Sequence, residues 1–350
     1  MIEDERLVRI CHYPTNRAPA RFLLACLLAK VHKPTVDIRK PFTEIRTADC
    51  YSGRNYDERY VQAFIMKHQL PLNRTTAFLT PAFRTFNQPL LAETGLSGRP
   101  AWLYSNLVSL LQDIQNGERP PEDYLKEVLR LLILQRKSQQ QAILERLRRI
   151  ESVPRELNTQ QIWEIISAHL KMPRSSRLPV LIIAAAYDTA QESLDKRYTR
   201  LLPHTAADKP ADALGDLEIE LSSQGHPYIV YEVKDKTITP GDIDSALQKL
   251  SERTELPAEY AFVSTKPIPP AVYDYIQSVN RQQRATELQA FDCLEFLKHF
   301  LHLFHEKHMQ FFDRYRELVL NEPTSAVAQR LKERLLELIE SAQGNRSSAQ

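Results

Sequence analysis

Hydrophobic positions in the first half of the chain repeat with the spacing of α-helices. Residues 57–68 (DERYVQAFIMKH) place four large apolar side chains at helical spacing, behind Asp57 as a cap. Residues 19–30 (PARFLLACLLAK) are almost continuously apolar and begin with proline, which is typical of a buried helix. We expect further helices at residues 102–115, 124–134, 139–150 and 159–171. The first half is therefore predicted to be mainly α-helical.

The pattern changes after an apolar helix predicted at residues 177–194 (RLPVLIIAAAYDTAQESL). Residues 217–221 and 228–234 alternate between apolar and polar side chains, which predicts two strands. Helices at 241–253 and 271–283, strands at 259–264 and 287–291, and a long helix from Asp292 to about residue 319 follow. This order predicts an α/β domain with a mixed sheet core flanked by helices. We divide the chain into a helical region, 1–176, and this domain with its C-terminal helices, 177–350.

The composition is that of an ordinary soluble globular protein, with 26% charged and 43% hydrophobic residues. No apolar run approaches the roughly 20 residues that a membrane span needs, and the N-terminus MIEDERLVRI has no secretory apolar region. The four cysteines are scattered without a CxxC pair, which favours reduced thiols over a zinc site. We therefore expect a cytoplasmic protein without a membrane partner.

Positive charge is concentrated in the middle of the chain, although the net charge is only +2. Residues 124–150 contain seven basic and two acidic side chains. Such a run favours a polyanionic partner, and a solvated helix face is the alternative.

The two predicted strands form a hairpin whose charged side chains gather on one face. Alternate strand residues face the same way, so Glu232 and Lys234 project together and Asp216 shares a face with Glu218. If the turn is centred on Gln224, Asp216 lies opposite Glu232, with their Cβ atoms about 5 Å apart.

Two opposed carboxylates on a partly shielded strand repel each other, so we expect a cation between them. Mg²⁺ fits, because hard ions favour carboxylate oxygens. Lys234 beside a metal and a phosphate can polarise an attacking water and offset charge in the transition state. The set predicts phosphodiester hydrolysis, with Asp216, Glu232 and Lys234 catalytic and with Asp216 and Glu232 as metal ligands. An edge hairpin whose acids face water and whose lysine pairs with one of them is the alternative.

The element order together with GD-x15-E-V-K resembles the PD-(D/E)XK nuclease superfamily, with Gly215 where the superfamily name has proline. More narrowly, the chain resembles the SacI family of restriction endonucleases in the stretches YDERYVQAFIMKHQLPLNRTTAFLTPAFRTFNQPL and GDLEIELSSQGHPYIVYEVKDKTIT. The resemblance implies a restriction-endonuclease-like core and a Mg²⁺-dependent type II site-specific deoxyribonuclease. It also implies a homodimer that cuts double-stranded DNA at a short palindrome, and a companion DNA methyltransferase. The superfamily often adds an acid from the preceding helix, for which Glu192 or Asp188 could serve.

A proline-broken polar arm at residues 70–91, together with SGRNYDERY just before it, is our predicted DNA-recognition region. Arginine, asparagine and glutamine read base edges, and threonine and arginine also grip phosphates. A polar surface loop is the alternative for any single residue. The predicted DNA-binding side chains are Arg54, Asn55, Asn73, Arg74, Thr75, Thr76, Arg84, Asn87 and Gln88.

Two other functions stay open: a structure-specific DNA repair nuclease of the same fold, and a DNA-binding protein that does not cut. The large helical half argues against the first. The presence of all three candidate catalytic side chains argues against the second.

Overall fold

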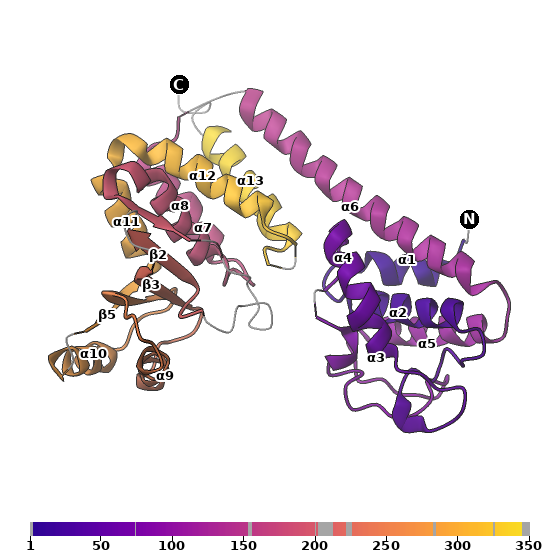
Figure 1. Ribbon diagram of the computed structural model, residues 1–350. Coiled ribbons are helices and arrows are strands. Elements are labelled where there is room, and N and C mark those ends of the chain that lie inside the picture. Colours follow the sequence, from indigo (N-terminus) through magenta and orange to yellow (C-terminus); the bar gives the residue numbers. More distant parts are fainter. Residues whose placement is uncertain are drawn as a thin grey trace. The chain divides into compact units, whose positions relative to one another are not determined.

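The structure is a computed structural model that describes residues 3–73, 75–152, 156–199, 201, 213–221, 226–282, 285–324 and 326–344. The chain forms two compact units, Met1–Ala142 and Ile143–Gln350 (Figure 1). A five-stranded mixed sheet flanked by helices and a helical N-terminal part confirm the predicted α/β class.

The N-terminal unit is built from helices around a cluster of stacked phenylalanines. Phe22 lies at its centre, with its ring centroid 4.0 Å from that of Phe83 and 4.6 Å from that of Phe78. Such pairs stabilise a core beyond the apolar area that they bury. The helices of this unit are α1 (Glu5–His12), α2 (Ala18–His32), α3 (Gly53–Tyr56), α4 (Gln62–His68), α5 (Ala101–Gln115) and the first part of α6 (Pro121–Ser152).

Two predictions for this unit need correction. The helices expected at 124–134 and 139–150 are one continuous helix, α6, because the connecting residues 135–138 (QRKS) contain no proline or glycine to end it. The helix at 57–68 exists but begins earlier, in α3, where Ser52 is the cap. Asp57 does not cap a helix, because it is buried in a π-helical turn, Asp57–Val61, where it pairs with Arg21.

The C-terminal unit contains a sheet with strands in the order β1 (Lys196–Tyr198), β2 (Leu217–Leu221), β3 (Pro227–Lys234), β4 (Glu259–Ser264) and β5 (Glu287–Asp292). The first three strands are antiparallel, and β3, β4 and β5 are parallel. The short strand β1 was not predicted. It places β2 between two strands and β3 at the centre of the sheet.

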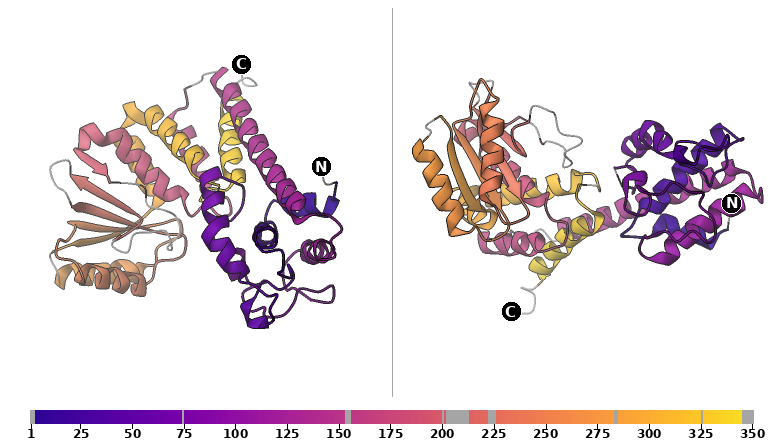
Figure 2. Two further views of the ribbon diagram at one scale, coloured as in Figure 1. Left: turned by 45° about the vertical axis from the view of Figure 1, so that its right-hand side comes forward. Right: turned by 90° about the horizontal axis from the view of Figure 1, so that it is seen from below.

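Helices cover both faces of the sheet, and alternate residues of β3 enter the two different cores (Figures 1 and 2). Ile229 and Tyr231 pack against the first set of helices, whereas Val230 packs against the second set. This confirms the predicted alternation of faces. The first set is α7 (Thr159–Leu170), α8 (Leu178–Leu194), α11 (Cys293–Leu303), α12 (His308–Asn321) and α13 (Gln329–Gly344), and the second is α9 (Pro240–Ser251) and α10 (Pro270–Gln282).

Two strongly apolar helices, α2 and α8, are buried inside their units. Nearly every residue of α8 from Leu178 to Tyr187 is buried between the sheet and α12. Continuous burial explains why neither helix has a polar face. Among the described helices, none combines the length and the apolar character needed to cross a membrane.

The long helix predicted from Asp292 to about residue 319 is interrupted. Helix α11 ends at Leu303, a 3-10 turn spans His305–Lys307, and α12 begins at His308. The break folds the chain back, so that the rings of Phe300 and Phe311 lie 5.1 Å apart in the core. Tertiary packing therefore overrides the helical pattern of the sequence here.

A buried histidine links three helices of the C-terminal unit. The Nδ1 atom of His169 lies 2.8 Å from the hydroxyl of Tyr315, and its Nε2 lies 3.0 Å from the carbonyl oxygen of Leu331. A neutral ring that donates from Nε2 and accepts at Nδ1 satisfies both contacts. Burial lowers the pKa of His169 to about 4.

We predict that the unfolding free energy falls as the pH is lowered from the unfolded-state pKa of His169, about 6.5, towards its folded-state pKa of about 4. The unfolded chain binds a proton in this window that the folded chain excludes. The expected loss at pH 5 is about 2 kcal/mol. Urea unfolding at both ends of this window measures it, and His169→Gln, which can still donate to Leu331, is the control. Equal pH dependence in the two proteins would contradict the assignment.

Candidate active site

The hairpin has the predicted register from Leu217 to Ile219. Leu217 pairs with Tyr231, Glu218 with Val230 and Ile219 with Ile229, which places position 216 opposite position 232. The register shifts by one residue nearer the turn, where Glu220 pairs with Pro227. The predicted turn centre, Gln224, lies outside the described residues.

Gly215 lets the chain approach β3 closely just before β2 begins. A Cβ atom at this position would lie 2.6 Å from the carbonyl oxygen of Tyr231 and 2.6 Å from Cγ1 of Val230. The next residue, Asp216, donates its backbone N–H to the same Tyr231 oxygen at 2.8 Å. Its Oδ2 accepts the backbone N–H of Val233 at 2.8 Å. Only glycine fits this approach without displacement, and the approach fixes the Asp216 carboxylate against β3.

Glu232 and Lys234 project together from β3, on the face that Val230 shares. The Nζ atom of Lys234 lies 2.9 Å from Oε1 of Glu232, and the two side chains are 20% and 13% exposed. Burial alone would lower the pKa of Lys234. The hydrogen bond to Glu232 and the charges of Asp242 and Asp216 outweigh burial, so the pKa lies above its usual value. Lys234 is therefore a charged donor next to both candidate metal ligands.

Helix α9 adds two charged side chains that the sequence analysis missed. Asp242 Oδ1 lies 3.6 Å from Nζ of Lys234, and Nζ of Lys249 lies 3.8 Å from Oε2 of Glu232. Burial tends to raise the pKa of Asp242, but its hydrogen bonds from Thr239 outweigh burial and lower it. In the sequence, Asp242 has the position of a residue at the start of a helix. No local pattern links it to the end of β3, eight residues earlier.

Tyr260 and Glu218 form hydrogen bonds to the segment that precedes Asp216. The buried hydroxyl of Tyr260 donates to the carbonyl oxygen of Leu214 at 3.0 Å and lies 3.5 Å from Oε2 of Glu232. Burial and the charges of Glu232 and Asp216 raise the pKa of Tyr260 well above its usual range, so it stays protonated. Glu218 Oε1 accepts the backbone N–H of Leu214 at 2.7 Å. Both side chains thus fix the segment that leads into Asp216.

The middle of the chain resembles one known family. Residues 155–264 match the model of the SacI restriction endonuclease C-terminal domain. The matched segment runs from α7 to the end of β4, and it contains the hairpin, α9 and every side chain of the cluster described above. The match supports a restriction endonuclease, and hence a nuclease. A search of curated proteins finds no match to the chain.

The cluster has the oxygen donors that a hard divalent ion prefers. Among the described residues, no three His, Cys, Asp or Glu side chains form a metal-binding group. Mg²⁺ needs fewer, because it commonly takes one or two carboxylates and fills its remaining positions with water and phosphate oxygens. Asp216 and Glu232 supply two carboxylates that both act electrostatically on Lys234 and Tyr260. The pair therefore fits the ion in donor chemistry and in number.

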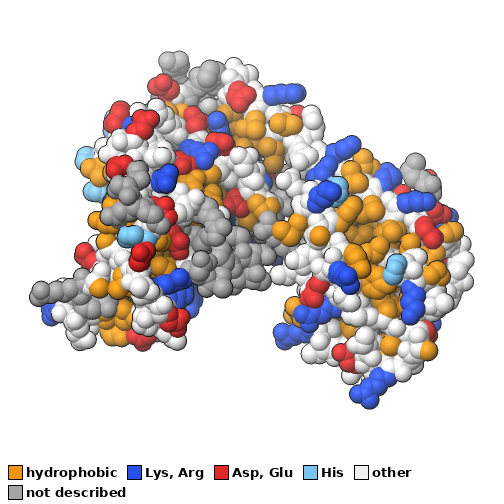
Figure 3. All heavy atoms as spheres, viewed as in Figure 1, with side chains coloured by type: hydrophobic (Ala, Val, Ile, Leu, Met, Phe, Trp, Pro, Cys, Tyr) orange, Lys and Arg blue, Asp and Glu red, His pale blue; other side chains and the backbone are white. Residues whose placement is uncertain are grey.

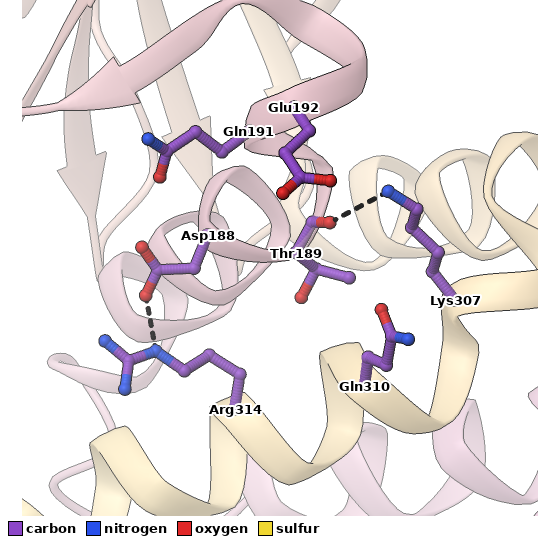
Figure 4. Close-up of a pocket in the computed structure, with 7 residues that line it drawn as sticks. All are labelled: Asp188, Thr189, Gln191, Glu192, Lys307, Gln310 and Arg314. Atoms are coloured by element: carbon purple, nitrogen blue, oxygen red, sulfur yellow. Dashed lines mark hydrogen bonds and ion pairs between the residues drawn. The ribbon is translucent and has the colours of Figure 1, made fainter.

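The two candidate additional acids lie on the other side of the sheet from Glu232. Asp188 pairs with Arg314 of α12 and accepts a hydrogen bond from Tyr198 at 3.1 Å. Helix α8 carries both acids and covers the Tyr231 face, since the hydroxyls of Tyr187 and Tyr231 lie 2.9 Å apart. Figure 4 shows the acids in a cavity of about 490 Å³ lined by Asp188, Thr189, Gln191, Glu192, Lys307, Gln310 and Arg314.

The predicted DNA-binding side chains of the N-terminal unit differ in exposure. Thr76 is buried, and its hydroxyl donates to Asp57 Oδ2 at 2.6 Å, so it serves the fold. Asn73 is half-buried, and Arg74 lies outside the described residues. Arg54 is exposed and pairs with Glu58 at 2.8 Å. The other exposed candidates are Asn55, Thr75, Arg84, Asn87 and Gln88.

The same unit exposes apolar side chains close in sequence to these polar ones. Tyr60, Phe64 and Leu79 are between 38% and 50% exposed. On the face seen in Figure 3, Lys and Arg side chains lie around hydrophobic ones in this unit. Such a mixture is compatible with a macromolecular contact.

We predict that Gly215→Ala lowers the unfolding free energy by about 1–3 kcal/mol, as overpacking typically does. The added methyl group would displace the segment from β3 and loosen the Asp216 carboxylate. Gly241→Ala is the matched control, because a Cβ there meets only Thr239 Oγ1, at 3.8 Å. Urea unfolding measures both variants, and a Gly215→Ala protein as stable as the control would contradict the close-approach argument.

Proposed function

We propose that the chain is a Mg²⁺-dependent type II restriction endonuclease of the PD-(D/E)XK superfamily, which cleaves double-stranded DNA at a short palindromic sequence. One observation carries the proposal. Asp216, Glu232 and Lys234 come together at the hairpin, inside the segment that matches a restriction endonuclease domain. The alternative of water-facing acids on an edge hairpin is disfavoured, because β3 is central and Glu232 is only 13% exposed.

The chemistry divides between the three side chains. Mg²⁺ bound by Asp216 and Glu232 would supply a Lewis acid and an activated water. Lys234 is a fully charged donor that can bind a phosphate oxygen and offset the negative charge that develops during hydrolysis. The bond from Val233 N–H to Asp216 and the contact of Tyr260 with Glu232 restrain the two carboxylates before DNA binds. Such preorganisation lowers the cost of assembling the site.

Recognition is assigned to exposed side chains of the N-terminal unit. Asn55, Thr75, Arg84, Asn87 and Gln88 are available for base or phosphate contacts. A palindromic site implies two copies of the chain related by two-fold symmetry, so we propose a homodimer. A companion DNA methyltransferase would protect the host sites.

Incubation of the protein with plasmids of varied sequence, in Mg²⁺ or in Ca²⁺, tests the proposal. Discrete double-strand fragments in Mg²⁺ alone are the expected result. Nicking of branched DNA without cleavage of plasmids would indicate a repair nuclease instead. DNA binding without cleavage in either ion would indicate a protein that does not cut.

We predict that Asp216→Ala and Lys234→Ala each reduce the cleavage rate by about 10²-fold or more, because each removes a charged group from the reacting centre. Both variants are expected to fold and to bind DNA. Lys298→Ala is the matched control, since Lys298 is an exposed lysine of α11, on the opposite side of the sheet. A Lys234→Ala protein with full activity would overturn the catalytic assignment.

A further inference from the structure

Asp242 holds its carboxylate in a fixed orientation at the start of α9. Its Oδ2 accepts the backbone N–H of Thr239 at 3.0 Å, as part of a capping box, and it also accepts the Thr239 hydroxyl at 2.7 Å. The other oxygen, Oδ1, lies 3.6 Å from Nζ of Lys234 and 3.3 Å from Nζ of Lys236. The side chain is only 10% exposed. The cap therefore points one carboxylate oxygen at the candidate catalytic lysine.

Lys234 needs such a second partner if Glu232 binds a metal ion. In the structure its ammonium group lies 2.9 Å from Oε1 of Glu232, an oxygen of a proposed metal ligand. A lysine and a divalent cation compete for one carboxylate, because each is stabilised by the same negative charge. Breaking the lysine's ion pair without compensation would leave a half-buried charge unpaired, which is costly.

We infer that Asp242 is a positioning residue, which accepts Lys234 when the Glu232 carboxylate turns to a divalent cation. The inference rests on the proposed function, because it assumes that Glu232 is a metal ligand. Asp242 lowers the cost of releasing Glu232 and keeps Lys234 charged and close to the scissile phosphate. Lys236, 69% exposed, pairs with the same oxygen from the solvent side and can move into water when Lys234 arrives.

Two other roles for Asp242 predict different behaviour. A carboxylate that only caps α9 would influence the stability of the helix and not metal affinity. A carboxylate that attracts the cation directly would strengthen binding whether or not Lys234 is present. The inferred role requires Lys234, because Asp242 then acts by relieving competition for Glu232.

Mn²⁺ binding to the full chain without DNA separates these roles, with the free ion measured by electron paramagnetic resonance. Mn²⁺ is a suitable probe, since it prefers the same oxygen ligands as Mg²⁺. We expect Asp242→Asn to raise the dissociation constant about five-fold or more, as typical for coupled sites. The asparagine oxygen can still accept the Thr239 bonds, so the cap is retained. Asp242→Glu, which keeps the charge at a position where capping boxes favour glutamate, should restore most of the affinity.

The decisive comparison repeats Asp242→Asn in a Lys234→Gln background. The inferred role predicts that the substitution then changes Mn²⁺ affinity less than two-fold, because the competing lysine is absent. An undiminished effect in that background would overturn the inference and indicate direct attraction. Unchanged affinity of the single variant would also overturn it and leave Asp242 as a cap.

Two controls complete the design. Asp235→Asn removes an exposed negative charge next to Lys234 in sequence, and Asp235 accepts a hydrogen bond from Thr265 rather than from a lysine. An equal loss of Mn²⁺ affinity in Asp235→Asn would count against a specific role of Asp242. Mn²⁺ binding that survives Asp216→Asn combined with Glu232→Gln would instead overturn the metal site of the proposed function. A failure of the Asp242 inference and a failure of the proposed function therefore give different results.

Discussion

The close approach of Gly215 to β3 is the constraint on which the arrangement of the cluster depends. It brings the backbone of Asp216 within hydrogen-bonding distance of Tyr231 and starts the β2–β3 ladder one residue later. Once that register is set, strand alternation sends Leu217 and Ile219 into the core beneath α8. The same alternation sends Glu232 and Lys234 to the opposite face, beside α9. A slip of β2 by one residue would exchange its two faces and turn Asp216 and Glu218 towards α8.

The cost of gathering charge in this half-buried place is offset by pairing. Three carboxylates, from Asp216, Glu232 and Asp242, lie near three lysines, Lys234, Lys236 and Lys249. Buried or half-buried charges are stable only when they are paired and hydrogen-bonded. The backbone N–H of Val233 and the two bonds from Thr239 supply further donors to the acids. These ion pairs and hydrogen bonds offset part of the repulsion between the three carboxylates.

Strand alternation explains why the hairpin could be predicted from the sequence. Period-two patterning is a local property, and it fixed the faces of Glu232 and Lys234 correctly. The symmetry of the two strands about a short turn gave the register of Leu217 and Ile219 as the structure has it. The roles of Asp242, Lys249 and Tyr260 were not predictable in this way. Their contacts depend on how α9 and β4 pack against the hairpin, which no spacing in the sequence encodes.

Two of the wrong helix boundaries have the same physical origin. Phe304 continues an apolar helical pattern, yet the chain turns there, because Phe300 and Phe311 pack together. Asp57 has the residue type and position of a cap, yet it is fully buried against Arg21. In each case a contact between residues far apart in the sequence is more favourable than the local preference for a helix or a helix cap. Local pattern therefore predicts the elements, and packing decides where they end.

The buried pair of Arg21 and Asp57 also explains how a loop with little regular structure can present a defined surface. Asp57 accepts the hydroxyl of Thr76 and the backbone N–H of Ala77, and Arg21 donates to the carbonyl oxygen of Asn73. These bonds fix both sides of Thr75, which is itself exposed. A loop anchored through its backbone in this way loses less conformational entropy when it binds than a free one does. The buried residues of the polar arm, Thr76 among them, thus hold its exposed residues in place.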